Sequence, residues 1–205
     1  MKKITTFIFS LLACLGAWAQ YQPSEEVLKS RKDFQDDKFG IFIHWGIYSM
    51  IGHGEWVMDK EAINYKEYTH LADGFYPSKF NAEEWVKAFK AAGAKYITFT
   101  SRHHDGFSMF KTATSNYNIV DGTPFKRDVL KELADACQKH GMKLHVYYSH
   151  AEWNRLDYPQ GWSAMRTGRP RDKENYDSYL KFMKQQLTEI LTNYGPVRCI
   201  WFDGH

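Results

Sequence analysis

The sequence predicts an α/β fold made of repeated strand–helix units. Three amphipathic segments each end at a glycine, and a short apolar segment follows each of those glycines. A fourth apolar segment precedes them all. The apolar segments lack the regular polar alternation of half-exposed strands, which is typical of parallel strands buried on both faces. The predicted order is therefore β-α-β-α-β-α-β.

The three helices are predicted from apolar periodicity and from their end signals. The segment 81–94, NAEEWVKAFKAAGA, begins with Asn81 as N-cap and carries Glu84 three residues later, in the manner of a capping box. The segments 128–141, DVLKELADACQKHG, and 175–195, NYDSYLKFMKQQLTEILTNYG, have the same apolar spacing. The apolar faces expected in the first and third helices are Trp85, Val86, Phe89 and Ala92, and Tyr179, Phe182, Met183, Leu187, Ile190 and Leu191.

The four strands are predicted at FGIFIHWG (39–46), KYITFTS (95–101), KLHVYYS (143–149) and VRCIWFD (197–203). The loops that run from strand to helix are long, spanning 46–80, 102–127 and 150–174, whereas those from helix to strand are short. Elaborate loops on one side only are typical of a (β/α)₈ barrel. The first strand is not followed by G-x-G-x-x-G, which counts against a dinucleotide-binding sheet.

A complete barrel needs eight strands and about 250 residues, and this sequence has 205 residues and four predicted strands. The predicted fold class is therefore α/β, the first half (about four βα units) of a (β/α)₈ TIM-like barrel, truncated after the fourth strand. A small open α/β domain is the alternative. A last strand left as an exposed apolar edge would be an aggregation liability, which favours a longer parent protein.

Residues 1–19 have the features of a signal peptide. Lys2 and Lys3 precede the apolar stretch ITTFIFSLLACLG, and AWA stands directly before Gln20. Lipoprotein processing at Cys14 is an alternative, because LLAC resembles a lipobox. Either route predicts export, to the periplasm or the extracellular space.

Composition excludes several classes of function. Without Lys2 and Lys3, 25 basic residues face 24 acidic ones, and no basic stripe indicates nucleic acid. After the signal peptide no segment is long and apolar enough for a membrane span. Only Cys137 and Cys199 remain in the mature chain, which is no disulfide framework, so both are predicted to be buried thiols.

Polar and aromatic residues gather where all four strands end. The first strand ends in His44 and Trp45, the second leads into SRHHDGF, the third ends in VYYSH and the fourth ends at Asp203. Parallel strands present their carboxyl ends at one rim, where barrels build active sites. The sequence therefore predicts a site at this rim.

A metal centre is one alternative for these residues. His44, a histidine after the second strand and Asp203 could bind zinc. However, the sequence has neither an H-x-H strand motif nor an H-E-x-x-H helix. Adjacent His103 and His104 are also expected to point in different directions along an extended chain. We therefore predict no metal and no cofactor.

The segments GIFIHWGIYS, GEW, SRHHDGFSMF and WFDG resemble, in order and spacing, those of the glycoside hydrolase family 29 α-L-fucosidases. The resemblance covers essentially all of the mature chain. It implies a retaining exo-glycosidase with a (β/α)₈-like barrel and a following β-sandwich domain. Residues 20–205 are then expected to be the N-terminal part of a glycoside hydrolase catalytic barrel, incomplete at its C-terminal side.

The resemblance also assigns roles to individual residues. Asp203 resembles the catalytic nucleophile. The residues expected to contact the substrate are His44, Glu55, Trp56, His103, His104, Tyr148 and Trp201, although the register of VYYS could favour Tyr147 in place of Tyr148. The expected partner is a fucosylated glycan, whose terminal α-L-fucose is released with retention of configuration.

The acid/base carboxylate of the family lies beyond the nucleophile, where this sequence has no residues. Loss of a general acid typically lowers the rate by about 10²–10⁴. We therefore expect little or no fucosidase activity from this chain alone, and a separately encoded second half is one way to complete it. The alternatives are another (β/α)₈ sugar hydrolase and a non-catalytic remnant that binds fucose.

Overall fold

The computed structural model describes residues 21–159, 161 and 166–204. The chain divides into two compact units, one that ends at Asp36 and one that begins at Asp37. Helix α2 (Glu25–Asp37) has no buried residue. The predicted signal peptide, with Cys14, lies outside the described residues. Within the described ranges, no helix has the length and apolar character needed to cross a membrane.

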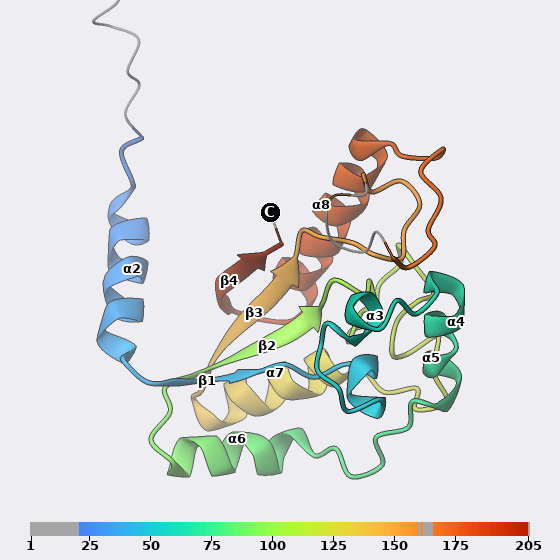
Figure 1. Cartoon of the computed structure of the whole chain (residues 1–205). Helices are drawn as coiled ribbons and strands as arrows, with labels where there is room; N and C mark the ends of the chain where they lie inside the picture. The colour runs from blue at the N-terminus through green and yellow to red at the C-terminus, as the bar shows by residue number, and fades with distance from the viewer. Residues whose placement is uncertain (1–20, 160, 162–165, 205) are drawn as a thin grey trace, which may run out of the picture. The chain divides into compact units, whose positions relative to one another are not determined.

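A four-stranded parallel sheet organises the second unit (Figure 1). Its strands are β1 (Gly40–Ile43), β2 (Tyr96–Arg102), β3 (Lys143–Ser149) and β4 (Val197–Asp203), and they are neighbours in that order. Helices α6 (Ala82–Ala91), α7 (Val129–His140) and α8 (Tyr176–Asn193) alternate with them. The predicted alternation is thus confirmed, and the strand order lacks the reversal that defines a doubly wound sheet.

Helices α6, α7 and α8 begin where a side chain satisfies a free backbone N–H group of the first turn. Oδ1 of Asn81 accepts a hydrogen bond from the backbone N–H of Glu84 at 3.1 Å. Asp128 and Asn175 cap α7 and α8 in the same way, each accepting from the third residue that follows. Such caps typically stabilise a helix by about 1 kcal/mol. Because Asn and Asp are preferred cap residues, the N-terminal ends of these helices could be predicted from the sequence.

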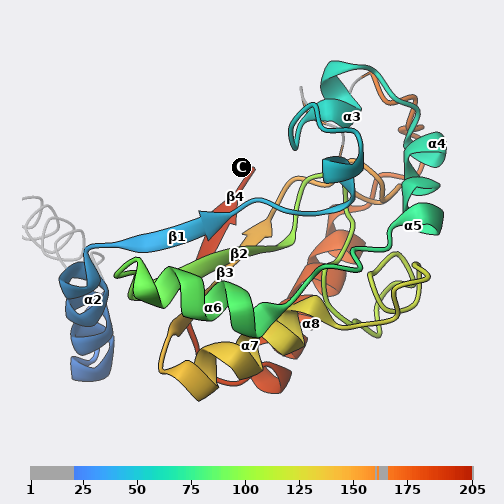
Figure 2. The same cartoon turned by 90° about the horizontal axis from the view of Figure 1, so that it is seen from below.

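The two faces of the sheet have different environments. On one face, Ile97, Phe99, Leu144 and Val146 are fully or almost fully buried in the hydrophobic core that includes residues of α6 and α7. These two helices run side by side along the sheet (Figures 1 and 2). The prediction that the strands are buried on both faces is confirmed for the central strands β2 and β3. It is wrong for β1 and β4, which are partly exposed.

The opposite face of the sheet is concave. Phe42 of β1 and Trp201 of β4 lie on it with ring centroids 5.4 Å apart, in an edge-to-face contact. In a flat sheet the first and fourth strands would stand about 14 Å apart, at about 4.8 Å per neighbour. The contact therefore indicates that the sheet curls toward this face.

The long loop from β1 to α6 contains short helical turns that periodicity does not predict. They are η1 (Ile47–Met50), α3 (Val57–Lys60), α4 (Tyr65–Thr69) and α5 (Leu71–Gly74). Each has four or five residues, too few for an amphipathic pattern to emerge. Ile47, Val57, Met58 and Tyr68 from these turns are buried in the core, so the loop is packed against the domain. Leu191 of α8, predicted to be on the apolar face, is instead half exposed.

Candidate active site

The structure brings together side chains from the carboxyl ends of all four strands. His44 follows β1, His103 and His104 follow β2, and Asp203 ends β4. The ring of Tyr147, from β3, stacks on His103 with centroids 5.3 Å apart, and His44 packs edge-on against both rings. Parallel pairing in register brings these strand ends to one rim.

His103 and His104 both face this rim, and the expectation that they would diverge was wrong. Strand β2 ends at Arg102, and a turn follows in which the N–H of Gly106 donates to the carbonyl of His103 at 3.1 Å. The alternation of an extended chain therefore does not apply to the two residues. Their ring centroids lie 4.2 Å apart.

Asp203 is held as an ionised carboxylate. The hydroxyl of Tyr147 donates to its Oδ2 at 2.8 Å, and the N–H of Gly204 donates to its Oδ1 at 2.7 Å. Burial tends to raise the pKa of Asp203, but these two hydrogen bonds and the nearby His104 and His44 outweigh burial and lower the pKa below its ordinary value. Its side chain remains 43% exposed, which leaves it accessible to a ligand.

The histidines, in contrast, are held neutral. Burial lowers the pKa of His104 to about 4, although the Asp203 carboxylate opposes this shift. Burial, followed by the neighbouring His104 and His44, places the pKa of His103 well below its ordinary value. Neutral imidazoles offer one donor and one acceptor each, the combination needed to bind hydroxyl groups. Among the described residues, Nδ1 of His103 has no hydrogen-bond partner.

Glu55 and Trp56 reach the same site from the loop after β1. The ring of Trp56 packs edge-on against His104, with centroids 5.1 Å apart, and against Trp153 at 5.0 Å. The charge of Glu55 raises the pKa of His44 and of His104 against the larger effect of burial, which lowers both. The structure thus places a carboxylate and an indole beside the histidines.

Tyr148 is the predicted site residue that the structure does not bring to the cluster. It is fully buried, and its hydroxyl donates to Oε1 of Gln186 on α8 at 2.8 Å. Successive side chains of a strand point to opposite faces, so Tyr147 occupies the position at the site. Trp201 lies two residues before Asp203 on the concave face and is half exposed.

The other nearby carboxylates are already occupied. Asp105 accepts hydrogen bonds from the Tyr68 hydroxyl at 3.0 Å and from the Phe107 N–H at 3.1 Å, and burial raises its pKa to about 6. Glu152 is fully buried in an ion pair with Arg102. Neither carboxylate is free to exchange a proton with a ligand at the rim.

Arg102, Ser149 and Glu152 form a support that sequence reasoning missed. Arg102 and Glu152 are 50 positions apart, and both are completely buried. A charged residue at the end of a predicted strand gives no signal of its distant partner. The one available clue was Glu152 in HAEWN, a carboxylate next to a tryptophan directly after the third strand.

A divalent cation would find one group of ligands here. His103, His104 and Asp203 have donor atoms that all lie within 4.8 Å of one another, and two imidazoles with a carboxylate are a common zinc-binding set. This group differs from the one considered from sequence, which included His44. The same three side chains can equally bind the hydroxyl groups of a sugar, so the geometry does not single out a metal.

Comparison with known proteins identifies the family of the chain. The family model for alpha-L-fucosidase matches residues 12–205. The chain belongs to the α-L-fucosidase family. Human plasma alpha-L-fucosidase is 34% identical over 90% of this chain and 42% of its own length. Alpha-L-fucosidase of Dictyostelium discoideum is 30% identical over 100% of this chain and 48% of its own.

Solved structures of the family have the same fold. Alpha-L-fucosidase isoenzyme 1 from Paenibacillus thiaminolyticus superposes with a TM-score of 0.79 and 38% identity, covering 86% of this chain and 43% of that one. Alpha-L-fucosidase AlfC from Lactobacillus casei, in complex with α-L-fucose product, gives 0.77 and 34%, covering 86% and 62%. The chain thus spans less than half the length of these two curated relatives and of the Paenibacillus enzyme.

Proposed function

We propose that this chain supplies the nucleophile and most of the fucose-binding side chains of an exported, retaining α-L-fucosidase. The observation that carries the proposal is the environment of Asp203, an ionised carboxylate at a strand end that faces neutral histidines. A similar structure holds α-L-fucose product, which supports terminal α-L-fucose of a glycan as the substrate.

In the proposed reaction, Asp203 attacks the anomeric carbon of fucose and the glycosidic oxygen leaves with a proton. The Tyr147 hydroxyl and the Gly204 N–H hold the two oxygens of Asp203 in place. Fixed geometry lowers the entropic cost of the attack. His44, His103 and His104 bind fucose hydroxyls, and the aromatic rings of Trp56 and Trp201 provide apolar contact.

In this proposal, none of the nearby carboxyl groups at the rim is the proton donor of the reaction. A retaining glycosidase needs a second carboxyl group about 5–5.5 Å from the nucleophile. Asp105 and Glu152 are committed to buried partners, and Glu55 is assigned to the sugar subsite by resemblance. A further segment, in the same polypeptide or in a separate chain, would add this group and the remaining strands of a (β/α)₈ barrel.

The test uses substrates that differ only in their need for a proton donor. α-L-Fucosyl fluoride has a leaving group that departs without protonation, whereas methyl α-L-fucoside requires it. We expect the chain to hydrolyse the fluoride at a rate at least about 100-fold above that of the methyl glycoside, because only the second reaction depends on the missing acid. Asp203→Asn should abolish the hydrolysis of the fluoride.

Asp135→Asn is the matched control, because Asp135 lies on the exposed surface of α7 in an ion pair with Lys131. It should leave the hydrolysis unchanged. Equal rates for Asp203→Asn and the parent chain would refute the role of Asp203. Efficient hydrolysis of methyl α-L-fucoside by the parent chain would show that an acid is already present.

A further inference from the structure

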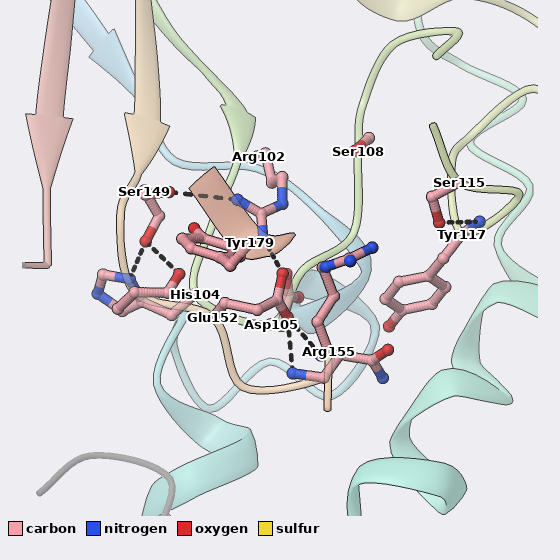
Figure 3. A network of polar contacts seen from close by, with 12 residues as sticks. Arg102, His104, Asp105, Ser108, Ser115, Tyr117, Ser149, Glu152, Arg155 and Tyr179 are labelled. Atoms are coloured by element: carbon pink, nitrogen blue, oxygen red, sulfur yellow. Dashed lines mark hydrogen bonds and ion pairs between the residues drawn. The ribbon is translucent and has the colours of Figure 1, made fainter. Parts of the chain in front are cut away.

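The hydrogen bonds of His104 determine which of its two ring nitrogens carries the proton. Nδ1 of His104 lies 2.5 Å from the hydroxyl oxygen of Ser149. The same hydroxyl lies 2.7 Å from the carbonyl oxygen of Ala151. The contact between Ser149 and His104 can be followed in Figure 3.

Only one arrangement of protons satisfies both contacts. A carbonyl oxygen has no proton, so the Ser149 hydroxyl must donate its single proton to Ala151. The oxygen of Ser149 can then only accept at its other contact, and the proton between it and His104 must belong to Nδ1. In a neutral imidazole the other nitrogen, Nε2, is then an acceptor.

This tautomer is opposed by Asp203. Nε2 of His104 lies 3.8 Å from Oδ2 of Asp203, and a carboxylate favours a protonated nitrogen next to it. Without Ser149, the proton would move to Nε2, where it would be directed at the carboxylate. Among the residues that the structure describes, Ser149 favours the other tautomer, because its oxygen accepts the proton on Nδ1 of His104.

Ser149 itself is held by a rigid, buried support. Nη1 of Arg102 donates to the backbone carbonyl of Ser149 at 3.2 Å, and Arg102 forms an ion pair with Glu152. Oε1 of Glu152 accepts hydrogen bonds from the N–H groups of Asn154 and Arg155 at 2.7 and 3.0 Å. The loop that carries Ala151 is thereby fixed relative to β3 (Figure 3).

We infer that Ser149 is a positioning residue that keeps the proton of His104 on Nδ1, so that Nε2 accepts a hydrogen bond from a substrate hydroxyl instead of donating to Asp203. The role of Nε2 toward a sugar rests on the proposed function, whereas the tautomer does not. The arrangement also keeps Asp203 free of a competing hydrogen bond from His104.

The tautomer can be read directly from the ¹⁵N chemical shifts of the imidazole nitrogens in the ¹⁵N-histidine-labelled chain at pH 7. His104→Gln assigns the signals. We expect a protonated Nδ1 and an unprotonated Nε2. Ser149→Ala should change the ratio of the two tautomers at least about tenfold toward protonated Nε2, since one net hydrogen bond is worth about 1.4 kcal/mol. Ser149→Thr, which keeps the hydroxyl, should restore the parent pattern.

Ser101→Ala is the matched control. Ser101 is equally buried, and its hydroxyl donates to the carbonyl of Tyr147 at 2.8 Å without touching a histidine. It should leave the His104 signals unchanged. A protonated Nε2 in the parent chain would overturn the inference without need of any variant, as would an unchanged tautomer in Ser149→Ala.

Titration with α-L-fucose separates this inference from the proposed function. If the chain binds fucose, Ser149→Ala should weaken binding about tenfold relative to Ser101→Ala. Binding that is equal in the two variants would refute the acceptor role of Nε2. A chain that shows the expected tautomer and binds no fucose would refute the proposed function and leave the tautomer assignment standing.

Discussion

At the scale of single residues, two adjacent tyrosines of β3 have separate tasks. The Tyr147 hydroxyl donates to Asp203, whereas the Tyr148 hydroxyl donates to Gln186 in the interior. Sequence reasoning favoured Tyr148 at the site, because the register of a run of apolar and aromatic residues cannot be read from its pattern. The hydrogen bond to Asp203 decides the register.

Replacing each tyrosine by phenylalanine tests this assignment. Tyr147→Phe removes a hydrogen bond that lowers the pKa of Asp203. The carboxylate then loses a donor that favours its charged form, so we expect the pKa of Asp203 to rise. The measurement is an NMR titration of the ¹³C signal of the Asp203 carboxyl group.

Tyr148→Phe is the control, since it removes a hydroxyl from the same strand on the opposite face. It should leave the titration of Asp203 as in the parent chain. A rise in the pKa of Asp203 in Tyr148→Phe alone would mean that the assignment of the two residues is reversed.

At the scale of elements, the sequence predicted what local rules determine. The four strands and the helices α6, α7 and α8 were predicted because caps, apolar periodicity and terminal glycines are local signals. The rim site was predicted because parallel strands must end together. The sequence did not predict the Arg102–Glu152 ion pair or the buried hydrogen bonds of Asp105, because these contacts depend on which loops meet in space.

The turn after β2, in the segment SRHHDGF, shows how a contact between two loops constrains one residue. Gly106 has φ +80°, and a Cβ at this position would lie 2.4 Å from Oε1 of Glu152. Gly106 is therefore constrained twice, once by its backbone conformation and once by the buried ion pair beside it. Replacing Gly106 by alanine should therefore cost more stability than replacing a glycine that has the backbone constraint alone.

Gly106→Ala should lower the free energy of unfolding by at least about 3 kcal/mol. About 1 kcal/mol of this comes from the left-handed backbone, and the remainder from displacement of Glu152 away from Arg102. Gly52→Ala is the matched control, because Gly52 has φ +77° with no atom within 4 Å of its Cβ position. It should cost only about 1 kcal/mol.

Urea denaturation of the two variants measures both values. Equal losses in Gly106→Ala and Gly52→Ala would show that Glu152 moves aside without cost, and the ion pair would then not constrain the turn. A larger loss in Gly106→Ala supports the role of the pair in fixing the loop after β3.

At the scale of the whole molecule, the two faces of the sheet differ in how far their side chains are exposed. The face toward α6 and α7 is a buried core, whereas Phe42 and Trp201 on the opposite face leave 41% and 51% of their surface exposed. Exposed large apolar side chains that contact each other on one face of a sheet favour contact with further protein.

Three buried histidines, two at the site and His145 near the start of β3, also influence how the stability of the fold depends on pH. His104 and His145 have pKa values lowered to about 4, with burial as the main cause, and burial also lowers the pKa of His103 well below its ordinary value. In the unfolded chain a histidine has a pKa of about 6.5. Between these values the unfolded state binds more protons than the folded state, so acidification destabilises the fold.

Asp105 has the opposite effect, because burial raises its pKa to about 6. In the window from about pH 6 to 4, the folded state binds the proton of Asp105 more tightly, which favours folding as the pH falls. From pH 7.5 to 4.5, His104 and His145 should each lower the free energy of unfolding by about 2–3 kcal/mol, and Asp105 should raise it by about 2 kcal/mol. The three histidines therefore outweigh the one carboxyl group.

We expect the free energy of unfolding, measured in urea, to be lower at pH 4.5 than at pH 7.5 by more than about 3 kcal/mol. His104→Gln should reduce this difference by about 2–3 kcal/mol, whereas Asp105→Asn should increase it by about 2 kcal/mol, because each removes one of the opposing contributions. Equal stability at the two pH values would contradict neutral, buried histidines at the site. Protonation of His104 at low pH should also weaken the binding of a ligand hydroxyl group, because protonated His104 has no nitrogen left to accept a hydrogen bond.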